Sequence, residues 1–155
     1  MFILFKKGIK NIEDIPEDIQ LTEKQLIQKS CLINKKEHIS AAKIKEFIDN
    51  IEYPVHFLDF ETINPAIPKY KNTRPYQRLP FQFSLHIEEK DKKELTHISF
   101  LEKENIDPRE GFINKLKENI KEKGSIICYN KHFELSLLKE ITKDNQRDKE
   151  WLEKI

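Results

Sequence analysis

Residues 55–62 read Val-His-Phe-Leu-Asp-Phe-Glu-Thr, and this stretch decides how the rest of the chain is interpreted. It follows Pro54, and its branched and aromatic residues are typical of a buried strand. Because side chains alternate across a strand, Asp59 and Glu61 are expected to share one face. Like charges on a half-buried face are costly to desolvate, and a divalent cation is the usual compensation. The alternative is a strand end where both acids reach solvent.

Composition limits the class of protein. The chain has 155 residues, enough for about one domain with a core, and a net charge of +1 that gives no global attraction for nucleic acid. Cys31 and Cys128 lie far apart, which predicts reduced thiols in a cytoplasmic protein. No stretch approaches the roughly 20 apolar residues of a membrane span, so no membrane partner is expected.

A helical N-terminal extension is expected over residues 1–50. Thr22, followed three residues later by Gln25, resembles a capping box that opens a helix reaching residue 30. Residues 1–5 are expected to form a short strand or the end of a preceding element. A second helix is expected to start at residue 40, with apolar residues at helical spacing. These are Ile44, Phe47, Ile48 and Ile51.

The second part of the chain, residues 51–155, alternates between strands and helices. The stretch 64–80 holds four prolines and is expected to be a long loop, which inside a compact domain is often functional. The expected order of strands and helices predicts a mixed α/β layer. Strands are expected over 55–62, 81–87, 95–101 and 125–129, and helices from Pro108 to Gly124 and over 132–142.

Two short segments resemble a known enzyme group. Residues 57–62 resemble the first motif of the DnaQ-like exonucleases, the DEDD group, in which the first strand carries Asp-x-Glu. Residues 129–134 read Tyr-Asn-Lys-His-Phe-Glu and resemble the second motif, Asn-x-x-Phe-Asp, with Glu134 at the position of the aspartate. The resemblance implies an α/β domain of the ribonuclease H-like fold, a mixed sheet flanked by helices.

The long loop carries a more particular resemblance. Residues 65–68, Pro-Ala-Ile-Pro, and residues 74–86, which begin Arg-Pro-Tyr-Gln-Arg, resemble an uncharacterised bacterial family, domain of unknown function 2779. That family is assigned to the same superfamily. The resemblance covers about residues 50–142.

The chain departs from the group in two ways. Glu134 is one methylene longer than aspartate, which shifts the metal or the helix slightly. The third motif, a His or Tyr shortly before a final Asp, has no convincing counterpart after Glu134. We therefore expect residues 51–155 to be an incomplete exonuclease domain, truncated at its C-terminus and weakly active or inactive by itself.

The resemblance also implies a chemistry. Two Mg²⁺ or Mn²⁺ ions about 4 Å apart would be held by Asp59, Glu61 and Glu134, with Asp59 bridging both. The implied reaction is 3′–5′ hydrolysis of DNA or RNA, at single-stranded ends. Association with, or fusion to, another nuclease domain is a further expectation. The alternative function is a catalytically degenerate domain that binds nucleic acid or serves as a scaffold.

Five further residues are candidates for contact with substrate. Arg74, Tyr76 and Gln82, together with Arg78, mix cationic, aromatic and amide groups that suit phosphates and stacked bases. The alternative is a loop that packs on the sheet, with Gln82 bonded to the loop backbone. Asn130 either touches substrate or fixes the turn into the following helix, and turn fixing is favoured.

Overall fold

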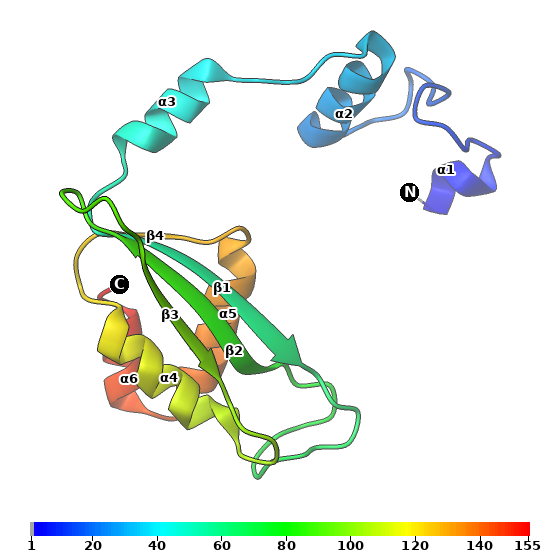
Figure 1. The fold of residues 1–155 in the computed structure, drawn as a ribbon. Helices are drawn as coiled ribbons and strands as arrows, with labels where there is room; N and C mark the ends of the chain where they lie inside the picture. The colour runs from blue at the N-terminus through cyan, green and yellow to red at the C-terminus, as the bar shows by residue number, and fades with distance from the viewer. Residues whose placement is uncertain (1) are drawn as a thin grey trace. The chain divides into compact units, whose positions relative to one another are not determined.

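The structure, a computed structural model, describes residues 2–155, with side chains from Ile3 onward, and Met1 lies outside it. The chain consists of two compact units, Met1–Asp49 and Asn50–Ile155. Figure 1 shows the helices of the first unit and the sheet and helices of the second. Each unit is described by itself below.

The first unit contains three helices, α1 (Phe2–Lys6), α2 (Glu23–Asn34) and α3 (Ala41–Asp49). Residues 2–6 are helical and do not form the short strand considered from sequence. The predicted capping box is confirmed, because the Thr22 hydroxyl accepts from the Gln25 amide and the Gln25 side chain accepts from the Thr22 amide. Neither α2 nor α3 contains a buried side chain, so this unit has little core of its own.

The second unit is a four-stranded mixed sheet flanked by helices, as predicted. The strand order is β3-β2-β1-β4, with β1 antiparallel to β2, β2 antiparallel to β3, and β1 parallel to β4. The last helix, α6, was not expected from sequence. The elements are β1 (Val55–Ile63), β2 (Leu79–Glu88), β3 (Thr96–Leu101), α4 (Pro108–Asn119), β4 (Ser125–Ile127), α5 (Lys131–Thr142) and α6 (Gln146–Leu152).

The core lies between one face of the sheet and the helices α4 and α5 (Figure 1). Phe112 of α4 is fully buried at its centre. Its ring makes edge contacts with Phe60, Phe83 and Phe100, with centroid distances of 4.9, 5.4 and 5.9 Å. Such pairs add to the free energy gained by burying aromatic area. The core therefore fixes β1 and β2 against α4.

One glycine allows β4 to reach β1. Gly124 has a φ of +96°, and a Cβ atom at this position would lie 2.0 Å from the carbonyl oxygen of Pro54. Only glycine tolerates both the backbone conformation and the close approach. The following residue, Ser125, donates its amide to the Glu52 carbonyl at 2.8 Å, which aligns the two strands.

Candidate metal and nucleic-acid site

The two acids of β1 lie on the open face of the sheet. Asp59 and Glu61 are exposed together with Phe57, whereas Leu58 and Phe60 point into the core. The shared face follows from the alternation of the strand. The half-buried face expected from the sequence is not found, because both carboxylates are exposed to solvent. Their desolvation therefore supplies no argument for a cation.

The neighbouring strand places polar groups beside these acids. In the antiparallel register Glu61 lies opposite Gln82 and Asp59 lies opposite Ser84. Opposite residues share a face, so the Gln82 side chain lies beside the Glu61 carboxylate on the open side. The register shifts directly after Glu61, where Thr62 pairs with Pro80. Such bulges re-aim side chains and are common beside active sites.

The third acid, Glu134, is buried. It lies in the first turn of α5, and its side chain is only 5% exposed. Its Oε2 atom is inaccessible to solvent and has no hydrogen-bond partner. A buried carboxylate oxygen without a donor is costly, and protein interiors rarely leave one in that state. A hydrogen-bond donor or a cation beside Glu134 Oε2 would remove this cost.

The negative charges of Glu134 and Asp59 both affect the thiol of Cys128. Burial, followed by the negative charges of Glu134 and Asp59, raises the pKa of the Cys128 thiol to about 11, against a smaller opposing effect of Lys131. Both carboxylates therefore lie close enough to disfavour the same thiolate. The parallel pairing of β4 with β1 creates this proximity, because Phe57 pairs with Ile127 just before Cys128.

The donor set suits a hard cation in its chemistry. Asp59, Glu61 and Glu134 supply carboxylate oxygens, which Mg²⁺ and Mn²⁺ prefer, and the unpaired oxygen of Glu134 lacks a positive partner. Within residues 2–155, no group of three or more His, Cys, Asp or Glu side chains is arranged to hold a metal ion. Asp59 and Glu61 thus share one face of β1, and the charges of Asp59 and Glu134 both act on Cys128.

The predicted substrate residues have different settings. Arg74 forms an ion pair with Glu140 of α5, with Nη2 and Oε1 2.8 Å apart. Tyr76 is exposed and adopts a left-handed φ of +58°. Asn130 caps α5, because its side-chain oxygen accepts from the Phe133 amide at 3.3 Å. The cap agrees with the favoured expectation that Asn130 fixes the turn.

The structure draws attention to two further residues, Tyr129 and Arg78. Tyr129 is fully exposed. The strand expected over residues 125–129 would have included Tyr129, but β4 ends at Ile127 and Tyr129 lies in the turn before α5. The Arg78 guanidinium lies 5.0 Å above the ring of Phe133. Nothing in the sequence separates Arg78 from its neighbour Arg74.

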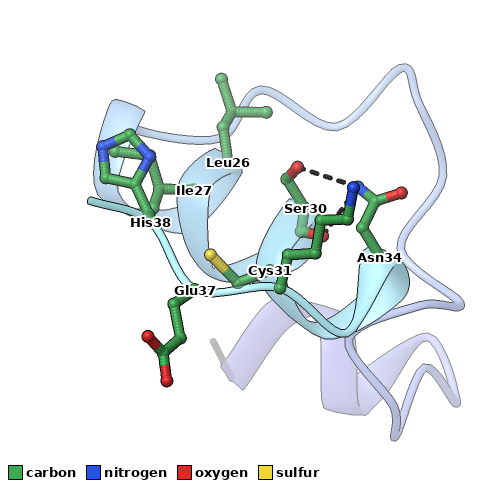
Figure 2. A pocket seen from close by; sticks show the side chains of 8 residues that line it. Leu26, Ile27, Ser30, Cys31, Asn34, Glu37 and His38 are labelled. Carbon is green, nitrogen blue, oxygen red and sulfur yellow. Dashed lines mark hydrogen bonds between the residues drawn. The ribbon is translucent and has the colours of Figure 1, made fainter. Parts of the chain in front are cut away.

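The first unit has a pocket of its own. It has a volume of about 530 Å³ and is lined by residues of α2 and the segment that follows it (Figure 2). Figure 2 shows Cys31, Glu37 and His38 among them, and Asn34 hydrogen-bonded to Ser30. None of the predicted site residues lines this pocket.

Comparison with known proteins gives one finding. No curated protein and no solved structure matches the chain. No described helix combines the length and the apolar character needed to cross a membrane. Residues 56–155, well over half of the chain, match the family described as Domain of unknown function (DUF2779). The chain therefore belongs to this family.

Proposed function

We propose that residues 50–155 form a ribonuclease H-like domain that hydrolyses phosphodiester bonds at nucleic-acid ends, in a metal-dependent 3′–5′ exonuclease reaction. The observation that carries the proposal is the buried Glu134 carboxylate, whose Oε2 has no donor. The negative charges of Glu134 and Asp59 both raise the pKa of the Cys128 thiol. The resemblance of residues 57–62 and 129–134 to two exonuclease motifs supports the same chemistry.

The three acids would hold Mg²⁺ or Mn²⁺. Asp59 and Glu61 extend from the open face of β1 and are free to turn toward a cation, whereas Glu134 is fixed by the helix that Asn130 caps. A divalent cation at this position would polarise the phosphate and lower the pKa of an attacking water. The protein supplies the placement of the negative oxygens that such an ion requires.

The remaining residues would bind the strand. The exposed Tyr129 ring would stack on a base, an interaction that tolerates any sequence. Gln82 would donate its amide to the Glu61 carboxylate and hold it in one orientation. The substrate is accordingly a single-stranded end of DNA or RNA, whose unpaired bases are free to stack.

A second function, nucleic-acid binding or scaffolding without hydrolysis, is favoured by two observations. Within residues 2–155 no three acidic, histidine or cysteine side chains are arranged to hold a metal. The third exonuclease motif has no counterpart in the sequence after Glu134. We therefore expect turnover by these 155 residues to be slow, and binding to be the more robust readout.

The test measures shortening and binding of 5′-labelled single-stranded DNA and RNA in Mg²⁺, in Mn²⁺ and in EDTA. Asp59→Asn, Glu61→Gln and Glu134→Gln are each expected to slow metal-dependent shortening by about 100-fold, because a catalytic cation supplies several kcal/mol. Glu94→Gln, at an exposed carboxylate in the β2–β3 turn, is the matched control and should behave as wild type.

The outcomes separate the two functions. Metal-dependent shortening that all three acidic variants lose supports the exonuclease. Binding without shortening supports the second function. Shortening that persists in EDTA, or in the three variants alike, contradicts the proposal, because it must arise from another site or from a contaminant.

A further inference from the structure

We infer that Arg78 is the phosphate-binding residue of this site, an inference that rests on the proposed function. The other two arginines near the long loop already form ion pairs within the chain. Arg74 is paired with Glu140 at 2.8 Å, and Arg109 is paired with Asp107 at 2.6 Å. Within residues 2–155, Arg78 has no carboxylate within ion-pair distance. Its charge is therefore available to an anion from outside the chain.

The Arg78 side chain is held in place by neutral groups. Its guanidinium lies 5.0 Å from the centre of the Phe133 ring, and its Nη2 donates to the Ser136 hydroxyl at 3.3 Å. That hydroxyl donates in turn to the Phe133 carbonyl at 2.9 Å, so it is oriented to accept. A guanidinium has five donors, and this arrangement uses one. The remaining donors form the planar fork that binds phosphate oxygens bidentately.

The position of Arg78 matches the proposed site. Phe133 and Ser136 lie on either side of Glu134 in α5. Arg78 also directly precedes β2, whose first residue, Leu79, pairs with Ile63 at the end of β1. The Arg78 side chain therefore lies between α5, which carries the buried Glu134, and the end of β1, the strand that carries Asp59 and Glu61. A phosphodiester is the ligand that uses a cation and metal-binding carboxylates at the same place.

This assignment changes the roles within the loop. Arg74 bonds through its backbone amide to the Gln77 side chain, at 3.0 Å, and Gln77 is buried. Together with the Glu140 ion pair, this contact makes Arg74 part of the attachment of the loop to α5. We therefore assign Arg74 a structural role and Arg78 the contact with substrate.

The experiment measures binding of a labelled single-stranded oligonucleotide at several salt concentrations, in Ca²⁺, which limits turnover. Replacing one phosphate contact should lower the slope of log affinity against log salt by roughly 0.7 for a single strand. Arg78→Gln is therefore expected to lose about that slope and to bind about 10-fold more weakly. Arg78→Lys keeps the charge and should keep the slope, with weaker binding because the fork is lost. Arg147→Gln, at an exposed arginine of α6, is the matched control and should keep the wild-type slope.

Two results would overturn the inference while leaving the proposed function standing. The first is wild-type affinity and slope in Arg78→Gln, alongside normal binding by the unaltered chain. The second is an equal loss of slope in Arg78→Lys and Arg78→Gln, since the charge is then irrelevant and the effect is one of folding. Absence of any binding by the unaltered chain in Ca²⁺, Mg²⁺ and EDTA would instead overturn the proposed function, and this inference with it.

Discussion

The two faces of the sheet have opposite characters. One face is apolar and buried under α4 and α5, where Phe60 and Phe83 contact Phe112. The other carries Asp59 and Glu61 in the open, beside a stacked pair of histidines, His86 and His97, whose ring centres lie 4.2 Å apart. A single strand, β1, serves both faces by alternation. Stability therefore depends on one face, whereas the proposed chemistry lies on and beside the other.

Glu134 is the exception to this division. It is an acid on the buried side, in the same helix as the core residues Leu137 and Leu138. Proteins retain unpaired buried polar groups mainly where function requires them, because the same position filled by an apolar side chain is more stable. This contrast between Glu134 and the open acids leads to the following predictions.

Truncation of the buried face has the largest expected effect. Phe112→Ala removes a fully buried ring that touches three others, and should lower the free energy of unfolding by about 3–5 kcal/mol. Phe57→Ala on the open face should change it by less than about 0.5 kcal/mol, as surface substitutions usually do. Urea denaturation of both variants measures the difference. Similar losses would mean that the open face is packed as well.

Removal of the buried acid should stabilise the fold. Glu134→Leu replaces a carboxylate oxygen that has no donor by apolar carbon, so we expect a gain of about 1–3 kcal/mol. Asp59→Asn removes a hydrated charge and should leave stability nearly unchanged. Thermal unfolding in EDTA provides the comparison. A loss of stability in Glu134→Leu would show that the carboxylate has a partner within the protein.

A buried histidine predicts a smaller, pH-dependent effect. Burial of His56 lowers its pKa below the ordinary value of 6.5, and the Ser125 carbonyl and the Glu89 charge only partly oppose this. In the unfolded chain the ring binds a proton near pH 6.5, so below that pH the unfolded state takes up more protons. Stability should therefore fall as the pH is lowered through 6.5 toward the folded-state pKa. His56→Leu should flatten this dependence, and His38→Gln, at an exposed site, should not.

The sequence predicts much of the sheet. The strands at 55–62 and 81–87 were recognisable because an alternating apolar pattern admits only one face toward a core. The helix after Pro108 was also expected, yet it ends at Asn119 and not at Gly124, because Ile120 already has an extended backbone. Helix α6 was missed because its residues are mostly polar, although Asn145 caps it in a recognisable way.

The site was less predictable than the fold. That Asp59 and Glu61 share a face follows from the period of a strand, but their exposure depends on which elements cover that face. The burial of Glu134 and the contact of Arg78 with Phe133 arise from packing between segments distant in the chain. A single sequence contains no local signal for such contacts.

The Cys128 thiol offers the most direct measurement of the central claim, that Glu134 and Asp59 share a divalent cation. In a Cys31→Ser background, the pH dependence of Cys128 alkylation reports its pKa, which burial, Glu134 and Asp59 together hold at about 11. Bound Mg²⁺ offsets the carboxylate charges, so the account predicts a lower thiol pKa in saturating Mg²⁺. Glu134→Gln should lower the pKa without Mg²⁺ and weaken the response to the ion. The same alkylation profile with and without Mg²⁺ would contradict the shared site.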